Sequence, residues 1–258
     1  MNIQLNHSQR KFIFILSITA IYIALIFYLD FLHGNYWHDE KTFWKTTLTF
    51  SDRLFPTIED LRDYTELNTP LPFIIFGALE YLFHQGIFTG RLLNLILSLI
   101  IVFIIGYPRQ SNRSSAILCL IGLFMCPYYL WLSGRLYTEM IACFCVIMGF
   151  VSYVGNRHLI SCIAFILAIA SRQYMLAFPM AIATYEFMIA IKNTRDFSRI
   201  TSLFKWRWLA PFIAALSIFV WIYLFQGLAP QTAFEVRLAP EVQRSTWALT
   251  PGGAMNFL

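Results

Sequence analysis

Long apolar runs without charged residues constrain this chain more than any other feature. The first run, Phe12–Leu29, contains no charged side chain, and several comparable runs follow it. A helix of roughly 20 apolar residues is long enough to cross the hydrocarbon core of a bilayer. We therefore predict an all-α fold, a polytopic transmembrane helical bundle of about seven spans. The predicted spans lie near residues 12–29, 92–107, 116–132, 136–154, 159–170, 174–191 and 208–225.

The composition agrees with a membrane protein and excludes several other classes. Hydrophobic residues make up 58% of the chain and charged residues 13%, whereas soluble domains have about 45–50% and about 25%. An ordinary soluble domain, a disordered chain and a collagen-like chain are therefore excluded. All five cysteines lie inside apolar runs, where they resemble small core side chains. They indicate neither a disulfide framework nor a metal site.

One further apolar run, Pro70–Phe83, does not fit a span. It begins Pro-Leu-Pro, contains Glu80 and is shorter than the runs around it. Proline is well tolerated in the first turn of a helix, and a short amphipathic helix can lie in the membrane interface. We predict that this run is an interfacial or re-entrant helix within a long loop, residues 30–91.

The distribution of charge supports that choice and orients the chain. If Pro70–Phe83 does not cross, ten of the 19 basic residues lie on one side with a single acid, Asp196. The other side holds nine basic and twelve acidic residues, and Glu186 lies inside the sixth span. Because basic loops stay in the cytoplasm, we predict a cytoplasmic N-terminus. The loop 30–91 then lies on the periplasmic, extracellular or lumenal face, in a bacterial plasma membrane or an ER membrane. The ten basic residues of the inner side are Arg10, Lys11, Arg109, Arg113, Arg157, Lys192, Arg195, Arg199, Lys205 and Arg207.

Two further expectations concern the basic inner loops and the C-terminal segment. The basic inner loops are expected to contact anionic lipid, and no compact basic domain is present that would bind nucleic acid. Residues 1–225 form the predicted transmembrane module, and 226–258 form an outer C-terminal segment. Because its last residues resemble the approach to another span, we expect this segment to be truncated relative to full-length relatives.

Ionisable residues beside membrane spans are costly and often functional. The first candidates are Asp39 and Glu40, which follow the first span among aromatic residues. A carboxylate near an apolar boundary can act as a general base, and Trp37 could stack on a sugar. The alternative is an interfacial aromatic belt beside a solvated charge pair, and the residues alone favour this alternative.

A second candidate group precedes the predicted interfacial helix. Thr69 is expected to cap that helix, with Pro70 at its first position. Glu66 could bend back toward Asp39, or this stretch could serve only as the cap.

The third and fourth groups contain arginines at the outer ends of spans. Arg135 and Glu139 are four residues apart, so on a helix they would share a face. They could form a helical salt bridge, or Arg135 could hold a phosphate. Arg172 and Gln173 lie in a minimal connection between two spans. Arg172 could extend toward the interface or bind an anion, and we favour anion binding.

The order of these motifs resembles that of the GT-C glycosyltransferases, membrane enzymes that use lipid-phosphate-linked sugars. Among them, the chain is most similar to the dolichyl-phosphate-glucose α-1,2-glucosyltransferase family over roughly residues 35–190. Two departures are that Met175 replaces an asparagine of the family's last motif and that the family's later spans are missing. The similar stretches are Asp39-Glu40, Asn68-Thr69-Pro70-Leu71-Pro72, Arg91-Leu92-Leu93-Asn94-Leu95, Leu136-Tyr137-Thr138-Glu139 and Ser171-Arg172-Gln173-Tyr174-Met175.

The resemblance implies a hexosyltransferase. A polyprenyl-phosphate sugar would be the donor, and a hydroxyl group of a glycan, lipid or protein would be the acceptor. Asp39 would act as general base, with Glu40 orienting it or the acceptor, and Arg172 and Arg135 would stabilise the phosphate. The site predicted is therefore Asp39 and Glu40 as catalytic residues, with six substrate-binding residues. These are Trp37, Glu66, Arg135, Glu139, Arg172 and Gln173.

Cofactor use and function class stay open at this point. No cofactor is required by the sequence, although Asp39, Glu66 and Glu139 could hold a divalent cation. A transporter or flippase for a lipid or small solute is one alternative function. A truncated, non-catalytic remnant is the other. Transporters usually place ionisable residues near the bilayer midplane, whereas the candidates here gather near one face, which favours an enzyme.

Overall fold

A computed structural model describes residues 7–30, 32–35, 37–106, 113–193 and 206–237. Within these ranges all regular secondary structure is helical, which confirms the predicted all-α class. The helices are α1 (His7–Leu29), α2 (His38–Thr49), α3 (Ile58–Arg62), α4 (Leu71–Phe83), α5 (Ile87–Gly106), α6 (Arg113–Met125), α7 (Pro127–Ser133), α8 (Glu139–Val154), α9 (His158–Ser171), the 3-10 helix η1 (Gln173–Leu176), α10 (Ala177–Asn193), α11 (Trp206–Leu216), α12 (Ile218–Phe225) and α13 (Gln231–Arg237).

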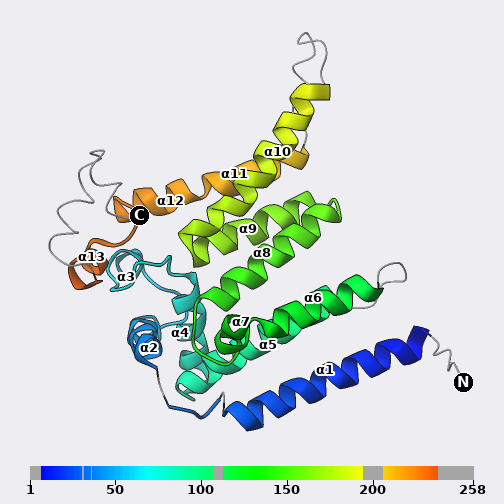
Figure 1. Ribbon diagram of the computed structural model, residues 1–258. Coiled ribbons are helices and arrows are strands. Elements are labelled where there is room, and N and C mark those ends of the chain that lie inside the picture. The colour runs from blue at the N-terminus through cyan, green and yellow to red at the C-terminus, as the bar shows by residue number, and fades with distance from the viewer. Residues whose placement is uncertain (1–6, 31, 36, 107–112, 194–205, 238–258) are drawn as a thin grey trace, which may run out of the picture.

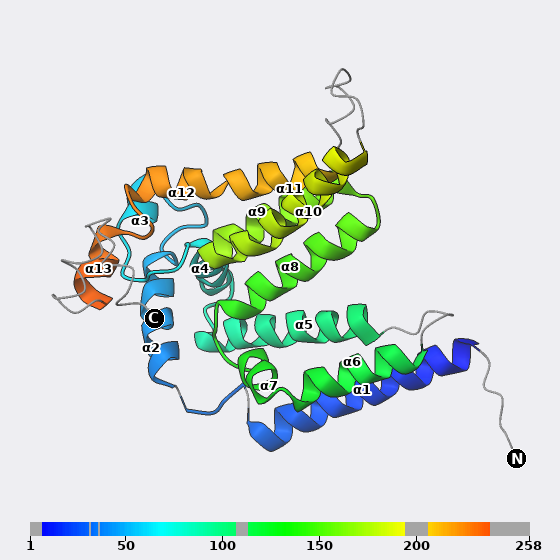
Figure 2. The same cartoon turned by 45° about the horizontal axis from the view of Figure 1, so that its top comes forward.

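The longer apolar helices lie side by side, and the short helices gather at one end of them. In Figures 1 and 2, α2, α3 and α13 lie together at one end of the molecule. The start of α1 and the turn between α8 and α9 lie at the opposite end in both views. This arrangement agrees with the predicted separation of the loop 30–91 from the basic connections. Of those basic residues, Arg109, Arg195, Arg199 and Lys205 lie outside the described residues, as does Asp196.

Among the described residues, three helical stretches are long and apolar enough to cross a membrane: Ile87–Gly106, Gln173–Lys192 and Trp206–Phe225. They correspond to the spans predicted near 92–107, 174–191 and 208–225. Large apolar side chains on the outside of the bundle are exposed, as with Leu159 and Val220, whose relative exposures are 74% and 64%. These features are compatible with a membrane protein. The count of seven spans stays a prediction.

The predicted span 116–132 is wrong as one continuous helix. The chain forms α6 and α7 instead, and the break falls at Cys126, which has an extended backbone (φ −79°, ψ 103°). Pro127 explains the break, because proline disfavours helical geometry at the residue before it and is itself suited to a first helical turn.

Other boundaries also differ from the sequence prediction. α5 begins at Ile87, so the connection after α1 ends earlier than residue 91, and it contains α2, α3 and α4 rather than one helix. α8 begins at Glu139, three residues later than predicted. Of the segment 226–258, residues 226–237 are described and include α13, while 238–258 lie outside the described residues.

Helix α4 corresponds to the run predicted as an interfacial helix, and it packs against α2, α5 and α9. It has 13 residues, fewer than a span needs. The predicted cap by Thr69 is wrong, because Pro70 is the N-cap and no side chain caps the helix. The Thr69 hydroxyl instead donates to the carbonyl oxygen of Ile169, at 2.8 Å. That carbonyl is in the last turn of α9, where helix carbonyls lack intrahelical partners.

The α2–α4 contact depends on a glycine. A Cβ atom on Gly77 would lie 2.6 Å from the backbone oxygen of Phe50. We expect Gly77→Ala to lower the free energy of unfolding by about 1–3 kcal/mol, because a backbone contact cannot yield as a flexible side chain can. Thermal unfolding of the detergent-solubilised protein measures this change.

Gly122→Ala is the matched control, since a Cβ atom there would meet nothing within 4 Å. Alanine favours a helix over glycine, so this variant should unfold no earlier than the wild type. Equal unfolding temperatures for Gly77→Ala and the wild type would contradict the close α2–α4 contact.

Candidate active site

The centre of the candidate site is the carboxylate of Glu40, which has no exposed surface. Glu40 is at the third position of α2, and its Oε2 accepts a hydrogen bond from the backbone N–H of Trp37, at 3.2 Å. A glutamate at this position commonly reaches back to the N-cap. Here the same carboxylate also accepts the Nε–H of Arg91 (3.0 Å) and the backbone N–H of Leu136 (2.8 Å). The carboxylate is therefore engaged by donors from three parts of the chain.

Two guanidinium groups compensate the buried charge. Arg91, which is 1% exposed, binds both oxygens of Glu40, with its Nη2 at 2.8 Å from Oε2. The Nη1 of Arg135 lies 3.4 Å from the same Oε2. An arginine that donates to both oxygens of a carboxylate forms stronger hydrogen bonds than two neutral groups do. Without them a buried carboxylate would cost several kcal/mol, so the cluster requires all of its members.

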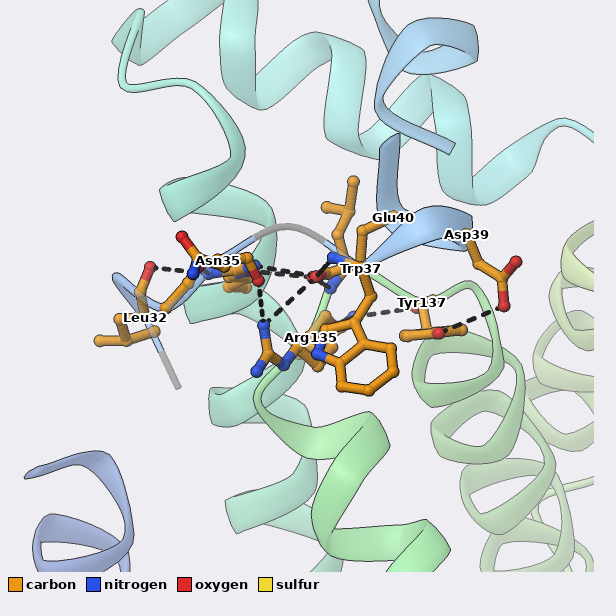
Figure 3. A network of polar contacts seen from close by, with 11 residues as sticks. Leu32, Asn35, Trp37, Asp39, Glu40, Arg135 and Tyr137 are labelled. Atoms are coloured by element: carbon orange, nitrogen blue, oxygen red, sulfur yellow. Dashed lines mark hydrogen bonds and ion pairs between the residues drawn. The ribbon is translucent and has the colours of Figure 1, made fainter. Parts of the chain in front are cut away.

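The remaining donors of the arginines hold the chain between α1 and α2. Arg91 donates to the carbonyl oxygens of Leu32 (3.2 Å) and Gly34 (2.8 Å), and Arg135 donates to that of Asn35 (2.8 Å). Figure 3 shows Leu32, Asn35 and Arg135 around the carboxylate of Glu40. These bonds fix the direction in which the chain enters α2.

Residues 134–138, between α7 and α8, form a non-helical segment that we call the 134–138 segment. The Nδ2 of the buried Asn94 donates to the carbonyl oxygens of Arg135 (2.6 Å) and Tyr137 (2.9 Å). Asn94 lies one turn after Arg91 on α5, so both side chains point to the same face. One face of α5 therefore binds Glu40 and the 134–138 segment together.

Asp39 points away from its neighbour Glu40. Its carboxylate lies at the exposed surface, and the hydroxyl of Tyr137 donates to its Oδ2 at 3.4 Å. In Figure 3, Asp39 and Tyr137 lie together on the side away from Asn35. Trp37 is 51% exposed and packs edge-on against Trp131, with ring centroids 4.6 Å apart. An exposed carboxylate beside an exposed indole is suited to a polar substrate with apolar faces.

Arg172 forms a second polar cluster at the start of η1. Its Nη2 donates to Glu139, and its Nη1 donates to the Oδ1 of Asn68 at 2.8 Å. Within the described part of the chain, the Nε of Arg172 is buried and has no hydrogen-bond partner. A buried donor without a partner is uncommon. This N–H is therefore available to an added acceptor.

Gln173 and Glu66 lie beside this second cluster. The Nε2 of Gln173 donates to the carbonyl oxygens of Leu67 (2.7 Å) and Leu228 (3.1 Å). Glu66 is 5% exposed. Burial raises the pKa of the Tyr64 hydroxyl, and the charge of Glu66 acts in the same direction. Tyr64 therefore stays protonated and donates to the carbonyl oxygen of Asn68, at 2.6 Å.

The 134–138 segment joins the two clusters. Residues 135 and 136 contact Glu40, residue 137 contacts Asp39, and Glu139, directly after the segment, contacts Arg172. Backbone atoms two residues apart are within about 7 Å even in an extended chain. The side chains of Asp39 and Arg172 are therefore held by positions two residues apart.

The structure corrects two expectations about these residues. Arg135 and Glu139 do not form a helical salt bridge, because only Glu139 belongs to a helix and the two bind different partners. Asp39, Glu66 and Glu139 do not form a cation site, since no group of three or more His, Cys, Asp or Glu in the described ranges could hold a metal ion.

Arg91 and Asn94 were not among the predicted site residues, although they lie in a stretch that carries the family resemblance. A signal for them was available. Arg91 is the one charged residue of a 20-residue apolar helix, and Asn94 is one turn further on. An ionisable residue in such a position indicates a buried partner.

Comparisons of the chain with protein-family models, curated proteins and solved structures found no match. The resemblance drawn from the sequence therefore stays a prediction.

The Glu40 cluster predicts a large effect of removing Arg91. In Arg91→Met, the buried carboxylate keeps its backbone N–H donors, but its only remaining ion pair in the described part of the chain is the longer one with Arg135, so we expect a loss of about 3–5 kcal/mol in the free energy of unfolding. The double variant Glu40→Met/Arg91→Met removes both charges and should be less destabilised than Arg91→Met alone. Thermal and denaturant unfolding in detergent measure both.

Arg53→Met is the control, because Arg53 pairs with Asp60 at 3.8 Å and is 55% exposed. A surface pair contributes about 0–1 kcal/mol. If Arg91→Met unfolded like Arg53→Met, the cluster would not hold the site together.

Proposed function

We propose that this chain is a membrane glycosyltransferase that moves a hexose from a polyprenyl-phosphate donor to an acceptor hydroxyl on the outer or lumenal face. The observation that carries the proposal is the contact of Asp39 and Arg172 with two positions only two residues apart, Tyr137 and Glu139. A base for a hydroxyl and a cation for a phosphate are the two groups that such a transfer needs. The resemblance to GT-C glycosyltransferases supports the same reaction.

In the proposed reaction, Asp39 takes the proton of the acceptor hydroxyl. The hydroxyl oxygen forms a bond to the anomeric carbon of the sugar, while the bond from that carbon to the phosphate oxygen breaks. The electron pair of the broken bond leaves with the polyprenyl phosphate. Arg172 stabilises the charge that develops there, as preorganised donors do in other enzymes. Its unpartnered Nε–H supports this role.

The buried Glu40 takes a different part in this proposal from its exposed neighbour. Because its carboxylate has no exposed surface, Glu40 orients the site and does not contact the substrate. Arg135 likewise holds the 134–138 segment through Glu40 and Asn35. Trp37 is half-exposed, and we propose that a sugar stacks on its ring.

An apolar cavity of about 650 Å³ supports a lipid-linked donor. It lies between α5, α8, α9 and α10, and all its lining side chains are apolar, Phe150 and Phe178 among them. Such a cavity is suited to part of a hydrocarbon chain. We propose that it receives the polyprenyl tail of the donor.

Asp39→Asn tests the proposed reaction. Without a general base, the rate of transfer should fall by about 10²–10⁴-fold, while membrane insertion stays intact because Asp39 is exposed. The measurement is release of polyprenyl phosphate by the purified protein in lipid nanodiscs with a panel of polyprenyl-phosphate sugars. Asp52→Asn, an exposed aspartate after α2, is the control and should keep full activity. Near-normal transfer by Asp39→Asn would remove Asp39 from the mechanism.

The proposed multi-pass topology is tested by cysteine labelling in a background without the five native cysteines. Phe55 is 80% exposed in the connection before α3, and Gly155 is exposed in the turn after α8, with φ −77°. Phe55→Cys should react with a membrane-impermeant maleimide on intact cells. Gly155→Cys should react only after the membrane is permeabilised. The reverse pattern would overturn the predicted orientation.

A further inference from the structure

The backbone of Tyr137 is held on both sides by buried groups. Asn94 donates to the carbonyl oxygens of Arg135 and Tyr137, and the N–H of Leu136 donates to Glu40. The ring of Tyr137 packs edge-on against Phe43, with centroids 5.7 Å apart and planes at 83°. Its position is therefore fixed by the Glu40 cluster and by α2.

The hydroxyl of Tyr137 is a hydrogen-bond donor at neutral pH. Burial raises its pKa, and the charges of Asp39 and Glu40 act in the same direction, whereas a hydrogen bond from Trp131 opposes them. The protonated Tyr137 hydroxyl donates to Oδ2 of Asp39, at 3.4 Å.

Trp131 is in turn fixed by its neighbours. Its ring lies edge-on against Trp37, and the guanidinium carbon of Arg135 lies 4.9 Å from the ring centroid. A cation in this position over an indole is favourable. Because Arg135 also contacts Glu40, the Trp131 ring is linked to the buried carboxylate through this arginine.

We propose that Tyr137 is a positioning residue for Asp39. This inference rests on the proposed function, in which Asp39 is the base. The Tyr137 hydroxyl occupies Oδ2 of Asp39, which directs Oδ1 to the acceptor hydroxyl. The contact is long at 3.4 Å, as catalytic hydrogen bonds often are before substrate binds. Tyr137 itself gives up no proton in the reaction.

Tyr137→Phe tests this role, because it removes one oxygen atom and keeps the ring. A misplaced base should lower kcat by about 10–100-fold, whereas KM for the donor should change by less than about twofold, since uniform binding is retained. Tyr81→Phe, an exposed tyrosine on α4, is the control and should leave both constants unchanged. Full kcat in Tyr137→Phe overturns the proposal.

A double-variant cycle separates positioning from packing. Tyr137→Phe should lower kcat in the wild-type background but should add little to Asp39→Asn, because Tyr137 acts through the Asp39 carboxylate. Equal effects of Tyr137→Phe in both backgrounds would show that Tyr137 acts by packing, and would overturn the proposal. Unfolding temperatures within a few degrees of the wild type show that the variants fold.

A chemical measurement tests the contact without any enzyme activity. A water-soluble carbodiimide modifies exposed carboxylates, and an oxygen that accepts a hydrogen bond attacks it less readily. Asp39 should therefore be labelled severalfold faster in Tyr137→Phe, while labelling of Asp52 stays constant, as read by mass spectrometry. Unchanged labelling of Asp39 overturns the inference even if no donor sugar is transferred. If Asp39→Asn is active but this labelling rises, the proposed function fails and the contact stands.

Discussion

A carboxylate without solvent contact lies where four parts of this chain meet. Glu40 of α2 binds Arg91 of α5, Arg135 and the N–H of Leu136 in the 134–138 segment, and its arginines bind the connection after α1. Burying a charge is unfavourable unless its partners are well placed. The four parts are therefore held in one arrangement, since a displacement of any of them would leave a charge or a donor without its partner.

This constraint explains how two adjacent carboxylates can have separate roles. Consecutive side chains on a helix point about 100° apart. Once Glu40 is fixed inside, Asp39 is directed toward solvent, where it meets Tyr137. The same segment that carries Tyr137 continues into α8, whose first residue, Glu139, binds Arg172. The exposed carboxylate of Asp39 and the guanidinium of Arg172 are thus both positioned through a single stretch of backbone.

The parts of this fold that depend on local sequence were predictable, and those that depend on distant partners were not. Hydropathy located the apolar helices, because the apolar run of each helix is visible in its own stretch of sequence. Hydropathy did not show the break at Cys126. This break follows from Pro127, a local signal other than hydropathy, and from the turn that the chain makes there. Asp39 and Arg172 were selected because charges beside apolar runs are conspicuous. The pairing of Glu40 with Arg91, 51 residues away, has no local signal. For the same reason Thr69 was assigned to the helix next to it, although its hydroxyl binds the distant α9.

The positions of the other ionisable groups bear on whether such a chain moves a solute or acts at the lipid boundary. Glu186 of α10 binds Tyr153, near the end of α8, and Arg207, at the start of α11. It is thus neutralised by partners at the ends of helices, away from the Glu40 cluster. Between these polar groups, the cavity among α5, α8, α9 and α10 is lined only by apolar side chains. A carrier needs polar groups near the midplane to bind its solute. Apolar walls instead suit a hydrocarbon tail, whose polar headgroup would then lie at the end of the bundle where Asp39 and Arg172 are held.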